Sequence, residues 1–101
     1  MGTRRRDSHC LIYLSLCGYK IYFWSNENSE PIHVHISKGI PVANSTKVWI
    51  TKNGGCILAN NASQIPDKIL REIMETITNN YFLVIAKWKQ HFPNKEIKFY
   101  C

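Results

Sequence analysis

The sequence predicts a single α+β domain, in which an antiparallel β-meander of four to five strands packs on one long C-terminal α-helix. The first half contains short runs of β-branched and aromatic residues separated by Gly, Pro and Asn turn signals. The second half contains one apolar stripe at helical spacing. A length of 101 residues suits one domain. We expect a flexible basic N-terminus at residues 1–10, the domain at 11–92 and a C-terminal tail at 93–101.

Five strand-like segments are expected, and the short loops between them favour antiparallel pairing. The strands are predicted at Leu11–Cys17, Tyr19–Ser25, Ile32–Ser37, Lys47–Thr51 and Cys56–Ala59. Gly18 separates the first two strands, and the polar segment Asn26–Pro31 separates the second from the third. Asn53-Gly54-Gly55 is typical of a tight turn between the last two strands.

The C-terminal helix carries start and stop signals at its ends. Ser63 can cap the N-terminus, Pro66 and Asp67 suit the first turn, and Pro93 ends the helix. Asn79-Asn80 can kink it, although the apolar stripe keeps its phase across them. The stripe consists of Ile65, Ile69, Leu70, Ile73, Met74, Ile77, Tyr81, Val84, Ile85, Trp88 and Phe92. Such a stripe must be buried against one face of the sheet.

Side-chain alternation predicts which face of the sheet the helix covers. The residues expected beneath the helix are Ile21, Phe23, Val34, Ile36, Val48 and Ile50. The opposite face then carries Tyr22, Trp24, His33, His35, Ser37, Lys47, Trp49 and Thr51. We expect this aromatic and cationic face to be an exposed recognition surface. Its predicted binding residues, with those of the adjoining segments, are Trp24, Asn26, Glu27, His33, His35, Lys38, Lys47 and Trp49.

The formal charge of +6 suits an acidic partner, either nucleic acid or an acidic protein, although solubility alone is an equal explanation. Residues 1–65 hold seven Lys/Arg and three Asp/Glu, a balance of +4, whereas residues 66–92 hold four and three. No apolar run is long enough for a membrane helix. Four cysteines without a C-x-x-C pair, and no secretion signal, favour the cytoplasm and free thiols.

His33-Val34-His35 places two imidazoles on the same side of a strand. They could act as a general acid–base pair, with Glu27 as a further catalytic candidate, or could recognise a partner. A metal would need further ligands, from Glu27, His9 or His91, and we predict no metal. A purely structural role is an equal alternative to recognition. No phosphate loop, nucleophile elbow or paired catalytic carboxylates are present, so no cofactor is predicted.

Three segments resemble the bacterial family called domain of unknown function 4160. They are Gly18–Glu27, Pro31-Ile32-His33-Val34-His35 and Ala86–Phe92, and the likeness covers roughly residues 11–92. The family often has Asn-Glu-His before the proline, where this chain has Asn28-Ser29-Glu30. That departure removes a third histidine. The segment Ile40–Thr46 also lacks the acidic pattern common in the family.

The resemblance brings no established activity, but family members are commonly proposed to belong to toxin–antitoxin pairs. It therefore implies a cytoplasmic, toxin-like interaction module whose partner is an acidic, antitoxin-like protein from the adjacent gene, or RNA. The alternative is a nuclease-like enzyme that uses His33 and His35 as the acid–base pair, with Lys38, Lys47 or Lys52 holding phosphate. A third hypothesis is a structural regulator without a ligand of its own.

Overall fold

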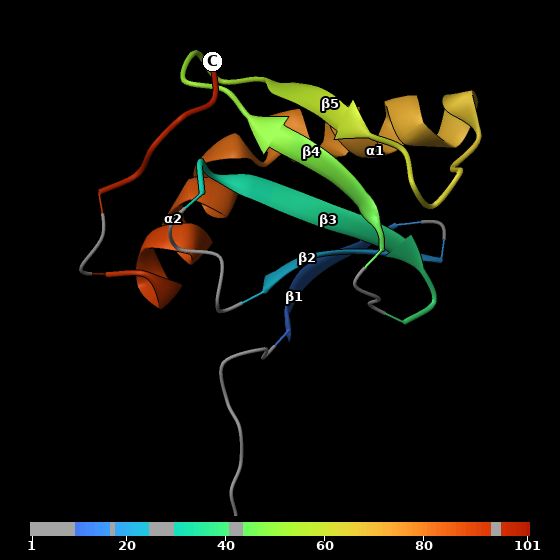
Figure 1. Cartoon of the computed structure of the whole chain (residues 1–101), viewed down its shortest axis with the longest axis horizontal. Helices are drawn as coiled ribbons and strands as arrows, with labels where there is room; N and C mark the ends of the chain where they lie inside the picture. Colours follow the sequence, from blue (N-terminus) through green and yellow to red (C-terminus); the bar gives the residue numbers. More distant parts are fainter. Residues whose placement is uncertain (1–9, 17, 25–29, 41–43, 94–95) are drawn as a thin grey trace, which may run out of the picture.

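The strands form a five-stranded antiparallel sheet in which chain neighbours are also sheet neighbours, as the sequence predicts (Figure 1). The computed structural model describes residues 10–16, 18–24, 30–40, 44–93 and 96–101. The strands are β1 (Cys10–Leu16), β2 (Tyr19–Trp24), β3 (His33–Lys38), β4 (Thr46–Ile50) and β5 (Cys56–Asn60). Each begins and ends within one residue of its predicted bounds, because the Gly, Pro and Asn signals between them are strong. The basic start at residues 1–9 lies outside the described residues.

The turn before β5 shows how a local signal fixes the pairing of two strands. Gly54 has a φ of +98°, which disfavours residues with a side chain. The hydroxyl of Thr51 donates to the Asn53 side chain at 2.8 Å and accepts from the Gly55 amide at 2.9 Å. These contacts close the turn and start the β4–β5 pairing, which continues from Ile50 opposite Cys56.

The C-terminal helical region consists of two helices, so the prediction of one long helix is wrong. Helix α1 spans Asp67–Asn79 and helix α2 spans Tyr81–His91. Asn80 separates them with φ −111° and ψ 26°, and its side-chain amide donates to the Thr76 carbonyl at 2.8 Å. An asparagine side chain that bonds to the backbone in this way competes with helix continuation. The predicted kink at Asn79-Asn80 is therefore a complete break.

Ser63 does not cap the helix, contrary to the prediction. Its hydroxyl instead joins the loop before α1 to the sheet, accepting from the Thr46 amide at 3.2 Å and donating to the Ile36 carbonyl at 3.1 Å. The helix begins at Asp67, directly after Pro66. Proline suits this position because a backbone amide at the start of a helix has no acceptor within the helix, so the missing hydrogen costs no hydrogen bond.

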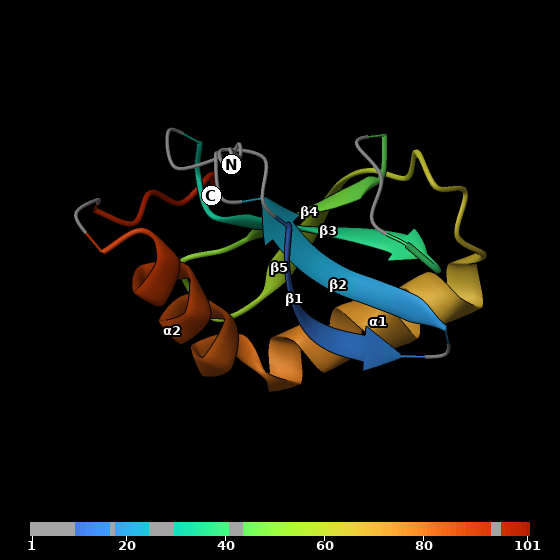
Figure 2. The ribbon, with the colours of Figure 1, turned by 90° about the horizontal axis from the view of Figure 1, so that it is seen from below.

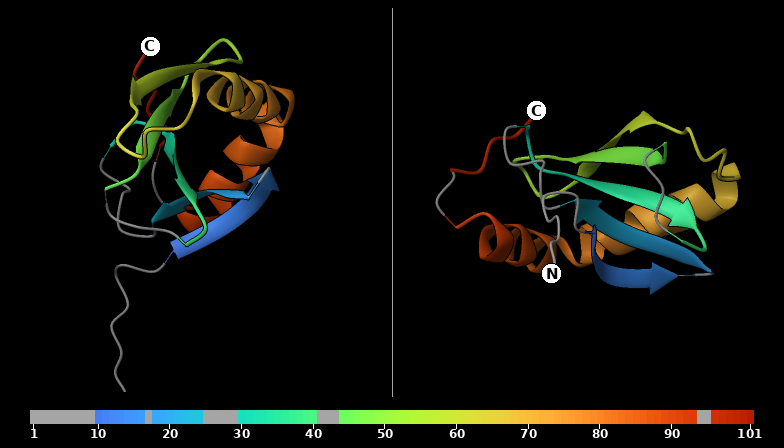
Figure 3. Two further views of the ribbon diagram at one scale, coloured as in Figure 1. Left: turned by 90° about the vertical axis from the view of Figure 1, so that its right-hand side faces the viewer. Right: turned by 60° about the horizontal axis from the view of Figure 1, so that its bottom comes forward.

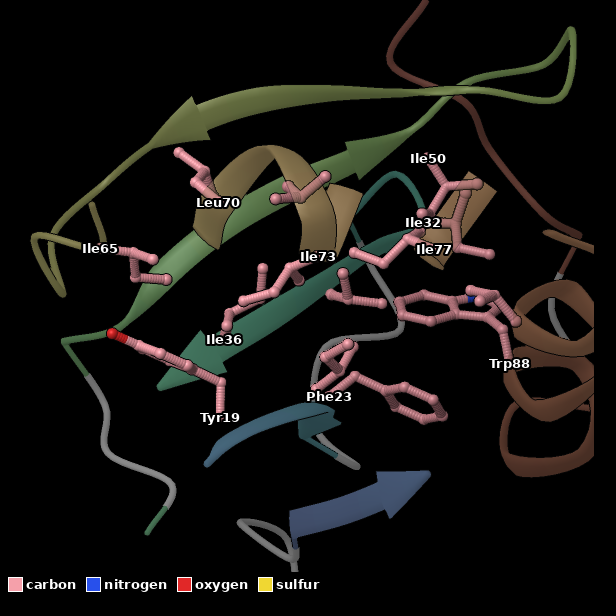
Figure 4. Close-up of a cluster of buried hydrophobic side chains, with 14 of the residues drawn as sticks. Tyr19, Phe23, Ile32, Ile36, Ile50, Ile65, Leu70, Ile73, Ile77 and Trp88 are labelled. Carbon is pink, nitrogen blue, oxygen red and sulfur yellow. The ribbon is translucent and has the colours of Figure 1, made fainter. Parts of the chain in front are cut away.

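Both helices lie on the same side of the sheet, and α2 runs at an angle to α1 (Figures 2 and 3). The predicted apolar face of the sheet is buried beneath them (Figure 4). The buried core contains Tyr19, Ile21, Phe23, Ile32, Val34, Ile36, Val48, Ile50, Ile65, Leu70, Ile73, Ile77, Val84, Trp88 and Phe92. The alternation in the strands and the stripe in the helices are thus both confirmed. At about 1.5–3 kcal/mol for each large side chain buried, this layer is the main source of stability.

The described part of the C-terminal tail packs against the sheet. The Ile32 amide donates to the Lys98 carbonyl at 2.8 Å, and the Lys52 amide donates to the Cys101 carbonyl at 3.0 Å. Ile97 and Phe99 are partly buried against the core. The tail therefore passes from the end of α2 to the turn between β4 and β5, where the C-terminus lies (Figure 1). Neither helix in the described part of the chain has the length and apolarity needed to cross a membrane.

Candidate functional site

Among the described residues, the sheet face opposite the helices carries the predicted side chains, but its centre is not exposed. His33 has no exposed surface and His35 is 7% exposed, and Tyr22, Ser37 and Thr51 are also buried. The prediction of an open recognition surface is therefore wrong for these five residues. Alternation assigns side chains to a face, but it contains no information about what covers that face.

His33 lies in a cage of aromatic rings at the start of β3. Its ring is edge-on to His35 with centroids 4.9 Å apart, to Trp49 at 5.7 Å and to Trp88 of α2 at 5.6 Å. Nδ1 donates a hydrogen bond to the Pro31 carbonyl at 2.9 Å. Because a carbonyl can only accept, this contact places the proton of a neutral imidazole on Nδ1. The pattern is that of a histidine with a structural role.

His35 continues the same row of rings toward β2. It stacks on Tyr22 with centroids 5.7 Å apart and planes 25° from parallel. Its Nδ1 shares a hydrogen bond of 3.1 Å with the hydroxyl of Ser45, which is itself buried. The two imidazoles do lie together, as the sequence predicts, but their contacts are with the protein interior.

The accessible part of this face lies around Trp49 and the tail. Tyr100 stacks on Trp49 with centroids 4.8 Å apart and planes 7° from parallel. The Lys47 ammonium lies 4.4 Å from the centre of a Trp49 ring and forms an ion pair of 2.6 Å with Glu30. Trp49 and Lys47 are therefore half-buried, and the lysine charge is already partly compensated.

The remaining predicted site residues are either described elsewhere in the fold or lie outside the described residues. Lys38 is exposed at the far end of β3, opposite Tyr19 of β2. Trp24 ends β2, but its side chain lies outside the described residues, as do Asn26, Glu27 and His9. In the described part of the chain, no three His, Cys, Asp or Glu side chains are grouped as metal ligands. His91 is exposed on α2, where its ring meets the edge of Phe23.

A second surface, on α2, was not singled out by the sequence. Phe82 is 82% exposed and Leu83 is 40% exposed on the outer side of this helix. Lys87 follows Leu83 by one turn and Lys89 follows Phe82 by two turns. Each lysine therefore lies on the same side of the helix as the apolar residue that precedes it. The helix contains no acidic residue. We call Phe82, Leu83, Lys87 and Lys89 the α2 surface.

An open groove adjoins the α2 surface, between α2 and the tail. It has a volume of about 550 Å³ and is lined mainly by apolar side chains. These side chains are Ile85, Phe92, Pro93, Ile97 and Phe99, with Lys89 and Glu96 at the charged positions. Lys89 therefore belongs to both the groove and the α2 surface.

A sequence model of the family described as domain of unknown function (DUF4160) matches residues 18–89. The chain belongs to this family. The DUF4160 segment begins at the turn before β2 and ends in α2 at Lys89, so it contains the histidine pair and the α2 surface. No curated protein and no solved structure matched the chain.

Proposed function

We propose that this DUF4160 protein is a cytoplasmic interaction module, the toxin-like member of a two-gene system, which binds an acidic protein partner through the α2 surface. The observation that supports this most is the side chain of Phe82, which is 82% exposed on a helix whose charged groups are all basic. Aromatic residues are enriched at the centres of protein interfaces, and charged residues are more common at their rims.

In this proposal, burial of Phe82 against the partner contributes part of the binding energy. Fully removing a phenylalanine side chain from water contributes about 1.5–3 kcal/mol, which corresponds to roughly a tenfold to hundredfold change in affinity. Lys87 and Lys89 would attract an acidic partner and orient it on the helix. The groove beside Lys89 offers further apolar area to an extended or helical segment of that partner.

The alternative nuclease-like enzyme has less support. Its acid–base pair would be His33 and His35, and both rings are buried among protein groups. A general base must come within about 2.6–3.2 Å of the proton that it removes. A substrate would reach these rings only if the surrounding side chains moved aside.

The proposal is tested by co-expressing the chain with the product of the adjacent gene and measuring both co-purification and growth inhibition. We expect Phe82→Ala and Lys89→Glu to lower the affinity for that product at least tenfold. Each substitution removes a side chain that is exposed in the free chain and would contact the partner in the complex. Tyr100→Ala and Lys52→Glu are matched controls, since both residues are exposed and neither belongs to the α2 surface.

The control variants also decide between surfaces. If Tyr100→Ala weakens binding and Phe82→Ala does not, the partner binds the Trp49 region and the proposed surface is wrong. If the chain binds RNA rather than the adjacent product, with an affinity that falls steeply as salt rises, the protein-partner proposal is wrong. Growth inhibition abolished by His33→Gln in a stably folded chain would favour the enzyme.

A further inference from the structure

We infer that two copies of this chain associate through the outer edge of β5 to form a twofold-symmetric dimer with a continuous sheet. In the described sheet β5 is an edge strand, paired with β4 on one side alone. Its sequence, Cys-Ile-Leu-Ala-Asn, contains no charged residue and no proline. Proteins commonly place Lys or Pro on an edge strand to prevent pairing with other chains, and β5 has neither.

The side chains of β5 are mostly exposed, and only Cys56 is partly buried. Ile57 is 40% exposed and Leu58 is 38% exposed. Ile57 lies opposite Trp49, on the face away from the helices, and Leu58 lies opposite Val48, on the helix side. Aliphatic groups thus extend past the edge on both faces of the sheet, where a second strand would cover them.

The register of the proposed pair follows from an irregularity in β5. Lys47 pairs with Asn60 and Val48 with Leu58, so Ala59 is an extra residue and forms a bulge. The regular part of the strand is therefore Cys56–Leu58. An antiparallel pair centred on this part places Ile57 opposite Ile57 of the second copy, and Cys56 opposite Leu58 of the second copy.

Helix α1 supplies the argument that the occupant is a second copy rather than another protein. The helix lies beside β5, since the Cys56 thiol is 3.5 Å from the Met74 carbonyl and 3.6 Å from the Thr78 hydroxyl (Figure 3). One strand residue advances about as far as two helix residues, so an axis at Ile57 passes α1 close to Ile73, its midpoint.

The charges on the outer side of α1 are complementary to those of a second α1 helix that runs antiparallel to the first. Lys68 and Arg71 precede the midpoint, whereas Glu75 follows it, with Glu72 beside the centre. These four exposed side chains line an open hollow of about 430 Å³. An antiparallel pair of α1 helices brings Arg71 of one copy opposite Glu75 of the other, twice by symmetry. A chain with a net charge of +6 can approach itself at this place because the strand is neutral and the helix does not share the positive excess.

Sedimentation of the full chain from micromolar to submillimolar concentration tests the inference. We expect the mass to rise from 11.8 kDa toward twice that value. Ile57→Lys should weaken the dimer at least tenfold, because it places two ammonium groups opposite each other at the axis. Phe82→Lys is the matched control: it also replaces an exposed apolar residue by lysine, and it should leave the dimer unchanged. Thermal unfolding of both variants shows whether they are folded.

A charge exchange tests the arrangement of α1 without touching the strand. Arg71→Glu alone should weaken the dimer by about tenfold, since it replaces two attractive pairs by repulsive ones. The double variant Arg71→Glu with Glu75→Arg should restore the affinity. A wild-type chain that remains monomeric, or a dimer that survives Ile57→Lys, overturns the inference. Neither result bears on whether the α2 surface binds an acidic partner.

Discussion

Replacing Trp88 by alanine should cost about 3–5 kcal/mol of the free energy of unfolding. Trp88 is 3% exposed, and its ring lies 4.6 Å from Phe92, 5.3 Å from Phe23 and 5.6 Å from His33 between ring centroids. The truncation therefore removes the contact that joins α2 both to the core and to the histidine row. A domain of this length typically has about 5–15 kcal/mol in total, so much of its stability would be lost.

Urea unfolding followed by circular dichroism measures this loss. If the surface exposed on unfolding is unchanged, the slope stays the same and the midpoint falls by about 2 M. Phe82→Ala provides the comparison on the same helix. Because Phe82 is 82% exposed, we expect its truncation to change the free energy of unfolding by less than about 0.5 kcal/mol.

The comparison can refute the reasoning in two ways. A loss below about 1 kcal/mol for Trp88→Ala would mean that the ring cluster does not hold α2 against the sheet. A loss for Phe82→Ala as large as that for Trp88→Ala would mean that Phe82 is covered in solution. The α2 surface would then be part of the fold rather than a site for a partner.

Two further predictions concern groups away from α2. Thr46→Val should cost about 1–3 kcal/mol in urea unfolding, because the buried hydroxyl donates to the Asn61 side chain at 2.7 Å and accepts from the Ser63 amide at 3.2 Å. Burial raises the pKa of the Cys56 thiol, and a hydrogen bond offsets this in part, so the thiol should react with a disulfide reagent more slowly than exposed Cys101. The same raised pKa favours the folded state below the ordinary thiol pKa. This contribution should disappear as pH rises through the raised value, and Cys56→Ala should remove that alkaline decline.

The core could be predicted because its signals are local and redundant. Ile21 and Phe23 on β2, and Ile73 and Ile77 on α1, each follow the period of their own element. Removing such large apolar groups from water is favourable in any arrangement that brings the two stripes together. The residues predicted to be buried are therefore the buried ones, whereas the predicted number of helices is wrong.

The exposure of the site could not be predicted, because burial of a sheet face depends on segments distant in sequence. His33 is covered in part by Trp49 of the neighbouring strand and by Trp88, which is 55 positions later in the chain. Tyr100 from the tail stacks on Trp49 in the same way. Nothing in the alternation of β3 encodes these contacts, and histidine suits both a buried and an exposed position.

The α2 surface was missed because charge was averaged over residues 66–92. That segment is nearly balanced, with four basic and three acidic residues, and the average suggested a neutral helix. All three acids, Asp67, Glu72 and Glu75, lie before the break at Asn80, so α1 has more acidic than basic residues and α2 is basic. Recognising the break as the end of one helix would have shown this difference. The exposure of Phe82 and Leu83 could not be predicted either, because both residues belong to an apolar run that also contains buried positions.

The two proposed surfaces lie on separate parts of the fold, and this separation has a consequence. The sheet is covered on one face by helices and around His33 on the other by aromatic rings and the tail, and both proposed surfaces lie outside these covered areas. Helix α2, which carries the α2 surface, and strand β5 lie in different parts of the fold (Figures 1 and 2). A dimer through β5 would leave both α2 surfaces open and thus double the valency for an acidic partner. Ile57→Lys should therefore reduce the apparent affinity for an immobilised partner but leave the affinity in solution unchanged, whereas Phe82→Ala should reduce both.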